Sequence, residues 1–415
     1  MLKLNKELKV KQEIFKKDIR AYTSFLILTF LFLATLPAEL ICNVRPIMIV
    51  VEGKFYFPIT FTYSEKEFGG TLPSEPDYKS ARFLQILKGM PEATQLDTKN
   101  AFGLEIGDFE EDNFSIGLDD FEDSEESITP PAEIMPTTET LLEPREFWAL
   151  WPPIRYDYQY IPTESNTGNV VLAAPYRTPT PSGEGFIESS WEDGHYLGTD
   201  DRGRDVLARL IYGFRISMLF GASLAITGTL IGCLMGGTQG FFGGWVDLVG
   251  QRLTEIWGSI PRLYILIILS SFLVPSALLL FLILNLTAWM GIAAYIRAEF
   301  LKVRNFEFVK AAKGLGVSNF TIMRKHILPN ALTPVVTFFP FEVTAGILAL
   351  VSLDYLNLGV PSPAPSMGEL LAQGKNNLQA LWILLPTFTA LTSMIVLLTF
   401  IGEGIRNAFD PRKTL

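Results

Sequence analysis

The chain has 415 residues, of which 48% are hydrophobic, and a formal net charge of −10. This net charge says little about partners, because acidic and basic residues occupy different regions. The apolar residues form blocks of about twenty, the length that crosses a bilayer core, which excludes an ordinary soluble protein. The sequence therefore predicts an all-α polytopic membrane protein with six transmembrane helices at residues 21–42, 216–238, 258–275, 277–296, 331–353 and 380–402.

The distribution of Lys and Arg predicts the orientation of these helices. Residues 1–20 carry seven basic residues and residues 297–325 carry another seven, whereas residues 354–379 contain only Lys375. Because basic loops stay in the cytoplasm, both termini, including the tail 409–415, are expected on the cytoplasmic side. A cleaved signal peptide is the competing interpretation of the N-terminus, but its apolar segment is long and residues 36–40 form a poor cleavage site.

Residues 43–213 then form one large external segment, in which we expect a small β or irregular domain. Residues 46–51 and 54–58 have the pattern of two strands around a Glu52-Gly53 turn. The acidic insert, residues 95–145, holds eleven Asp and Glu between 101 and 126 and predicts a solvated segment; a trap for cations or basic peptides is the alternative. Aromatic residues at 147–156 either lie at the outer membrane interface or pack the external domain.

An Asp-rich turn at residues 197–205 precedes the core of five predicted transmembrane helices, residues 214–408. The spacing of its acidic residues lacks the alternation of a calcium loop. We interpret it as a helix start, with Thr199 or Asp200 as the cap and Asp205 in the first turn.

The second predicted helix carries glycines at every fourth position. This stripe lets another helix approach closely in lipid, so we expect helix packing, with a role in lining a substrate path as the second interpretation. After it, residues 249–257 have apolar side chains at helical spacing and predict an interfacial helix on the cytoplasmic surface. The four glycines are Gly228, Gly232, Gly236 and Gly240.

The cytoplasmic loop, residues 298–330, predicts a knob that fits a groove on a soluble partner. Four apolar residues share one helical face, whereas Lys310 and Lys313 are expected to stay in water. Gly316 stands where the helix should end in a left-handed residue. A second helix follows, and the chain re-enters the membrane at Leu328-Pro329. The residues of the predicted face are Phe308, Ala311, Ala312 and Leu315.

Glu342 places a carboxylate at membrane depth in the fifth predicted helix. Ionisable groups there are costly and face a protein interior or a water-filled path. Glu342 is therefore a candidate residue of a pathway or a subunit interface. The alternative is that it only forms a structural hydrogen bond.

The cytoplasmic loop resembles the coupling loop of type I ABC importer permeases. Five residues match that pattern, while Lys310 replaces its Glu and His326 its Ile; an ordinary amphipathic loop is the alternative. The turn at 197–205 is similar to that of peptide and nickel permeases. Segments at 63–70, 151–155, 352–356 and 368–378 resemble the Yej-type permeases of microcin C and oligopeptide importers. The five matching residues are Ala311, Ala312, Gly316, Leu328 and Pro329.

The resemblance implies an inner-membrane permease for oligopeptides or peptide-like compounds. Its implied partners are a second permease, cytoplasmic ABC ATPases, a periplasmic peptide-binding protein and the lipid bilayer, with no nucleic acid. ATP-driven closure of the ATPases would move the coupling loop and switch the permease pair between outward and inward openings.

No phosphate-binding loop is present in the sequence, so ATP and magnesium are expected only on the partner ATPase. The two histidines, His195 and His326, fall on opposite sides of the membrane, which disfavours a paired-histidine zinc site. No catalytic, cofactor or metal site is predicted in this chain. A secondary transporter would need internal repeats, and a membrane enzyme would need more polar groups than Glu342.

Overall fold

The fold was analysed in a computed structural model, which describes residues 2–89, 145–162, 170–179, 186–274 and 276–410. The chain divides into two compact units, one of residues 1–44 and 152–415, the other of residues 45–151. The single external segment predicted at 43–213 is therefore divided between them. The acidic insert predicted at 95–145 lies outside the described residues, except for Arg145, as do residues 411–415 of the predicted tail.

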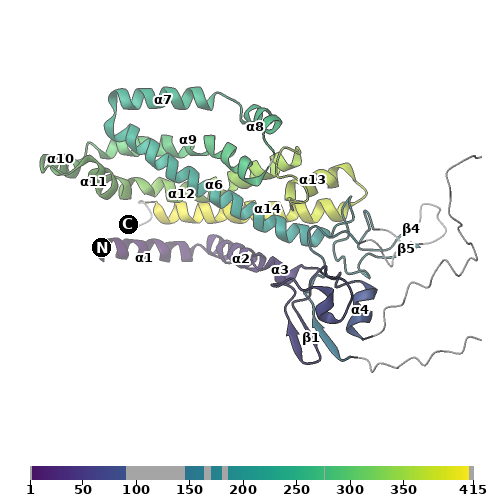
Figure 1. The fold of residues 1–415 in the computed structure, drawn as a ribbon. Helices are drawn as coiled ribbons and strands as arrows, with labels where there is room; N and C mark the ends of the chain where they lie inside the picture. The colour runs from purple at the N-terminus through teal and green to yellow at the C-terminus, as the bar shows by residue number, and fades with distance from the viewer. Residues whose placement is uncertain (1, 90–144, 163–169, 180–185, 275, 411–415) are drawn as a thin grey trace, which may run out of the picture. The chain divides into compact units, whose positions relative to one another are not determined.

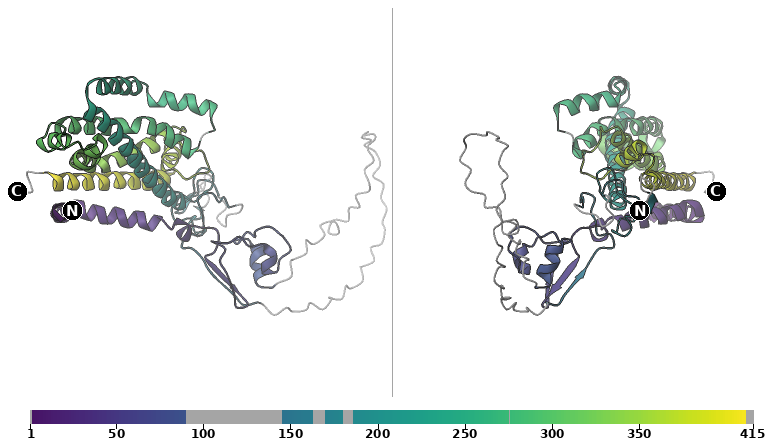
Figure 2. Two further views of the ribbon diagram at one scale, coloured as in Figure 1. Left: turned by 60° about the vertical axis from the view of Figure 1, so that its left-hand side comes forward. Right: turned by 90° about the vertical axis from the view of Figure 1, so that its right-hand side faces the viewer.

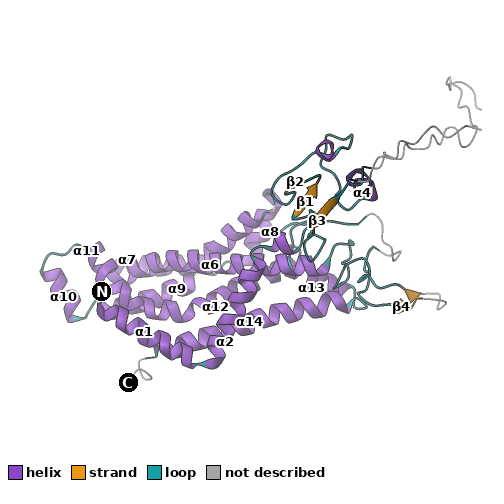
Figure 3. Cartoon of the chain, turned by 90° about the horizontal axis from the view of Figure 1, so that it is seen from below, coloured by secondary structure: helices purple, strands orange, loops and turns teal. Residues whose placement is uncertain are grey.

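The smaller unit contains an antiparallel sheet with the order β2-β1-β3. The predicted hairpin is confirmed, with Glu52 and Gly53 in the left-handed region between β1 and β2. The aromatic side chains of Phe147 and Trp151 pack against the core of this unit, as the second interpretation expected. Figure 3 labels four of its elements, β1 (Met48–Val51), β2 (Lys54–Tyr56), α4 (Ala81–Leu87) and β3 (Phe147–Leu150). The fifth is the short 3-10 helix η1 (Glu65–Phe68).

The larger unit consists mainly of helices, with a two-stranded sheet of β4 (Thr178–Pro179) and β5 (Phe186–Ile187). The α-helices are labelled in Figure 1: α1 (Leu2–Lys17), α2 (Ile19–Thr35), α3 (Ala38–Ile41), α6 (Val206–Phe242), α7 (Gly244–Gly258), α8 (Arg262–Phe272), α9 (Ala277–Val303), α10 (Glu307–Gly314), α11 (Asn319–Thr321), α12 (Leu328–Tyr355), α13 (Met367–Asn376) and α14 (Leu381–Phe409). The short segment η2 (Ile322–Ile327) lies between α11 and α12.

Four of the described helices are long and apolar enough to cross a membrane, and a fifth crossing is counted if the bent pair α1 and α2 is one span. They contain the predicted segments 216–238, 277–296 and 331–353, and all but the first residue of 380–402. Figure 2 shows these long helices side by side in two views. The four are Val206–Phe242, Ala277–Val303, Asn319–Tyr355 and Leu381–Phe409.

Two predicted spans differ from the structure. The span predicted at 21–42 overlaps α2, which begins at Ile19 and ends at Thr35 because Pro37 interrupts the helix before α3. The span predicted at 258–275 contains only the eleven residues of α8. A break at residues 259–261 separates α8 from α7, since Pro261 lacks a backbone N–H and disfavours helix in the residue before it.

Helices α6 and α9 run in the same direction. Gly228 near the middle of α6 faces Ala288, and Gly240 near its end faces Arg297 and Phe300 of α9. Because these pairs advance together along both helices, the chain between them must return to the opposite end of the bundle.

Helix α7 begins this return along α9. Asp247 forms a bidentate ion pair with Arg297, and the indole nitrogen of Trp257 donates to the carbonyl of Leu286 at 2.9 Å. Residue numbers rise in α7 as they fall in α9, so the two helices are antiparallel. The segment 249–257, predicted as an interfacial helix, lies within α7.

The main core of the larger unit lies between α6, α12 and α14. Its buried side chains include Met218 of α6, Ile347 of α12 and Met394 of α14. Gly221 and Gly346 let α6 and α12 approach closely, since a Cβ on Gly346 would lie 3.0 Å from the Cα of Gly221. This packing holds the helices that carry the candidate sites.

Candidate functional site

One face of α10 anchors the predicted coupling segment to the helix bundle. Val309 and Ala312 of α10 are buried in a cluster with Phe241 of α6 and Phe300 of α9. Ile322 and Ile327 of the following segment join the same cluster. The segment is therefore packed into one apolar cluster that also holds residues of α6, α9 and α12.

The opposite face of this segment is exposed. Leu315 is 84% exposed and Phe320 is 70% exposed, while Phe306 and Phe308 contact each other edge to face at 6.0 Å. The predicted face is thus divided, because Ala312 points inward whereas Phe308, Ala311 and Leu315 point outward. The exposed residues form an apolar patch, named here the outer patch: Phe306, Phe308, Ala311, Leu315 and Phe320.

Gly316 terminates α10 in the left-handed conformation, with φ of +76°. The amide of Gly316 donates to the carbonyl of Lys313, and the amide of Val317 donates to the carbonyl of Ala312 at 3.1 Å. These bonds use carbonyls that would otherwise lack a partner at the helix end. The glycine predicted to end the helix adopts the expected conformation.

The chain after Gly316 forms one continuous helical run from α11 through η2 into α12. Pro329 lies at the start of α12 and produces no break, so the predicted boundary at the proline is corrected. The preceding segment, η2, is a π-helix, and the amide of Leu328 donates to Met323, five residues earlier. Leu328 packs partly against the buried cluster, and Pro329 is exposed.

Basic side chains flank the outer patch. Lys310 forms an ion pair with Glu307 at 3.1 Å. Lys313 lies over the ring of Phe241 at 4.8 Å, a contact that the prediction of a fully hydrated side chain did not include. Arg324 and Lys325 are exposed.

The four glycines of the predicted stripe are all buried on the side of α6 that faces α9. A Cβ on Gly232 would lie 2.9 Å from the carbonyl oxygen of Trp289, and one on Gly236 would overlap the carbonyl oxygen of Ala293. Gly228 and Gly240 meet α9 in the same way. The stripe therefore contacts α9 along its length.

Glu342 lines a cavity of about 220 Å³ among α6, α8, α9 and α12. Its carboxylate lies against Gly291 of α9, where a Cβ would be 3.9 Å from Oε1. Arg262, the first residue of α8, lines the same cavity. The rest of the wall is largely apolar.

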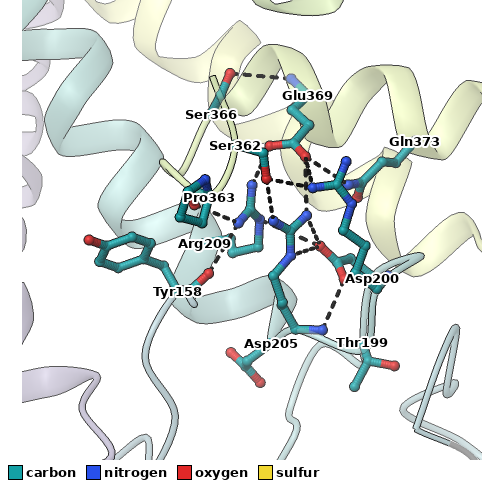
Figure 4. A network of polar contacts seen from close by, with 12 residues as sticks. Tyr158, Thr199, Asp200, Asp205, Arg209, Ser362, Pro363, Ser366, Glu369 and Gln373 are labelled. Atoms are coloured by element: carbon teal, nitrogen blue, oxygen red, sulfur yellow. Dashed lines mark hydrogen bonds and ion pairs between the residues drawn. The ribbon is translucent and has the colours of Figure 1, made fainter. Parts of the chain in front are cut away.

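A buried ionic network joins the loop before α6 to α13 at the other end of the bundle (Figure 4). Asp200 pairs with Arg204 at 2.7 Å, and Arg209 pairs with Glu369 at 2.5 Å. Arg204 also reaches Glu369, at 3.1 Å. Although burial opposes its charge, the hydrogen bond to Asp200 and the negative charges nearby raise the pKa of Arg204.

Backbone carbonyls add further contacts to the terminal nitrogens of Arg209. Its guanidinium donates to the carbonyl oxygens of Tyr158, Pro363 and Ala364, at 3.1, 3.4 and 3.5 Å. Asp200 accepts hydrogen bonds from the backbone amides of Arg202 and Arg204. The network thus fixes the loop from Pro361 onward against the first turns of α6.

Asp205, and neither Thr199 nor Asp200, caps α6. Its Oδ1 accepts a hydrogen bond from the amide of Ala208, and its Oδ2 lies 2.8 Å from His195 Nδ1. The predicted cap is corrected, because Asp200 is occupied in the ionic network. The sequence analysis does not single out Arg209 and Glu369. An arginine in the first turn of a long apolar helix is nevertheless a signal of a buried ion pair.

No group of three or more His, Cys, Asp or Glu side chains placed to hold a metal ion occurs in the described part of the chain. The candidate sites are therefore an apolar patch, a charged cavity and a structural ion network.

Comparison with known proteins gives a direct family assignment. The family model described as "Binding-protein-dependent transport system inner membrane component" matches residues 228–415. The chain is 40% identical to the peptidoglycan transport system permease protein YejE of Agrobacterium fabrum, covering 96% of this chain and 92% of that protein. It is 37% identical to the inner membrane ABC transporter permease protein YejE of Escherichia coli K12, covering 97% and 96%.

A further relative matches about half of this chain. The oligopeptide transport system permease protein OppC of Escherichia coli K12 is 38% identical over 53% of this chain and 74% of its own length. The chain belongs to the family of binding-protein-dependent transport system inner membrane components, and it is a permease subunit of an ABC importer.

Proposed function

We propose that this permease imports oligopeptides or peptide-like compounds and couples to cytoplasmic ATPases through the outer patch. The observation that carries the coupling role is the division of α10 into a buried face and an exposed apolar face. Val309 and Ala312 lie in a buried cluster with residues of α6 and α9, while Leu315 and Phe320 remain available to a partner. A displacement of the patch would therefore be transmitted to two long helices.

The proposed partners are a second permease, ABC ATPases and a periplasmic peptide-binding protein. Sites for ATP and magnesium are assigned to the ATPases, since the sequence contains no phosphate-binding loop. The transport names of the YejE and OppC relatives support a peptide or peptidoglycan fragment as cargo. Glu342, in its cavity between four helices, is proposed to lie on the path of that cargo.

We propose six crossings, in which α7 and α8 together form the third. The parallel course of α6 and α9 supports this, because the chain between them has to return across the bundle. The other crossings are α2, α6, α9, α12 and α14. Figure 1 shows the free ends of α1 and α14 at the same end of the helices as α10, which supports cytoplasmic termini.

The test of coupling is co-purification of the permease with ABC ATPases from its own cells. The wild-type chain should retain them, and Leu315→Asp should lose them while still inserting into the membrane. Retention of ATPases by both Leu315→Asp and Phe320→Asp would refute the proposed contact.

The test of topology is labelling of single cysteines in intact cells with a membrane-impermeant maleimide. A cysteine at Leu378, between α13 and α14, should react from outside, and one at Phe320 should react only after lysis. Reaction of Phe320→Cys in intact cells would overturn the orientation.

A further inference from the structure

We propose that the cavity between α8 and α12 binds the charged ends of a zwitterionic solute. Glu342 would face the ammonium group and Arg262 the carboxylate. This inference rests on the proposed import function and specifies the chemical class that the path recognises.

Glu342 is a carboxylate without a protein partner. It lies near the middle of α12, and no hydrogen bond or ion pair joins it to any residue that the structure describes. A carboxylate at this depth in a membrane is costly unless another group compensates it. Arg262 is the charged group whose field acts on Glu342.

Arg262 is also unpaired among the described residues. It begins α8 directly after the break at Pro261, so its position is set by the interruption of the third crossing. Arg262 and Glu342 come from different elements and line one cavity, yet they form no ion pair with each other in this conformation. Arg262 is exposed and Glu342 is half-buried, so both charged groups are accessible to a solute that enters the cavity.

The remainder of the cavity suits a small organic solute. Leu224, Leu284 and Met290 give it apolar walls, and the hydroxyl of Thr287 already donates to the carbonyl of Leu284. Apolar walls with a few placed polar groups are typical of ligand sites. A volume of 220 Å³ corresponds to about seven water molecules at ~30 Å³ each, enough for an amino-acid-sized group.

The two opposite charges favour a zwitterion over a simple ion. A cation near Glu342 would be repelled by Arg262, and an anion near Arg262 would be repelled by Glu342. A solute with an ammonium and a carboxylate group can satisfy both at once. The free ends of a short peptide have this chemistry.

The experiment is cysteine protection in the assembled transporter in lipid nanodiscs. Ala345, an exposed residue of the cavity wall, is replaced by cysteine in a Cys42→Ala, Cys233→Ala background. The rate of its reaction with a methanethiosulfonate reagent is measured with tri-alanine, N-acetyl-tri-alanine or tri-alanine amide. Leu348→Cys, on the exposed side of α12 outside the cavity, is the control cysteine.

We expect tri-alanine to slow the labelling of Ala345→Cys and to leave Leu348→Cys unchanged. Each blocked peptide should give the same protection only at a concentration about tenfold higher, because one charge-assisted contact is lost. Glu342→Gln should remove the preference over the N-acetyl peptide, and Arg262→Gln the preference over the amide. Arg252→Gln, at an exposed ion pair of α7, should remove neither.

Three results would overturn the inference. The first is that Ala345→Cys does not react with the reagent. The second is that all three peptides protect it equally. The third is that no peptide changes the labelling rate, while Glu342→Gln and Arg262→Gln change that rate to the same extent. The last result would instead indicate a direct Arg262–Glu342 ion pair. If the ATPases still co-purify in these cases, the proposed coupling stands; if they do not, the proposed function fails separately.

Discussion

Arg209 and Glu369 stand 160 residues apart in the sequence and form an ion pair of 2.5 Å, with the arginine side chain fully buried. The pair joins the first turn of α6 to α13, and Asp200 and Arg204 extend it into the preceding loop. Four charged groups therefore hold the loop between α12 and α13 in place. Buried pairs of this kind stabilise only when every charge has partners.

Arg209→Met should destabilise the larger unit. Removing one member of a buried pair leaves Glu369 and Asp200 undercompensated, and the expected loss is about 3–5 kcal/mol. The measurement is the thermal unfolding of the detergent-solubilised protein. Arg202→Gln is the matched control, because Arg202 is half exposed and its guanidinium lies 3.8 Å from the Glu369 carboxylate, farther than that of Arg209. The loss of this pair should cost less than about 1 kcal/mol. Equal effects of the two changes would contradict this account.

Leu315→Asp and Phe320→Asp should abolish ATPase binding without affecting folding. Both side chains are exposed, so a carboxylate there remains hydrated, yet it would be buried against an apolar partner groove. Val309→Asp is the contrasting change, because Val309 is fully buried and its replacement should prevent folding. Pull-down yield and thermal stability should thus separate the two kinds of variant.

Gly316→Ala and Gly314→Ala should have opposite effects. Neither glycine has an atom within 4 Å of the position of an added Cβ, so steric contact does not distinguish them. Gly316 has φ of +76°, where alanine costs roughly 1–2 kcal/mol, whereas Gly314 is helical, where alanine gains up to about 1 kcal/mol. Thermal unfolding of both variants checks the sign, and a stabilised Gly316→Ala would refute the left-handed assignment.

Gly236→Ala should be more harmful than Gly228→Ala. The added methyl at Gly236 would overlap the backbone carbonyl of Ala293, which cannot move without separating α6 from α9. At Gly228 the closest atoms are 3.3 Å away, a contact that a small shift relieves. We expect a loss of about 1–3 kcal/mol for Gly236→Ala. Loss of this order at Gly228 and none at Gly236 would be inconsistent with the packing described.

Local features of the chain were predictable from the sequence. The left-handed Gly316 and the hairpin at Glu52-Gly53 follow from the conformational freedom of glycine, which acts at a single position. The long apolar blocks likewise located four membrane-length helices, because hydrophobic length is a property of contiguous residues. The division of α10, by contrast, depended on which side met Phe241 and Phe300.

The sequence by itself determined where apolar segments lie, which glycines permit close approach and where the helix before Gly316 ends, since each depends on neighbouring residues in the chain. Only the tertiary structure decided that α6 and α9 are parallel, that Arg209 meets Glu369, and that Arg262 shares a cavity with Glu342. Those contacts join residues about 60 to 160 positions apart, and no local propensity specifies which distant side chains meet once the helices pack.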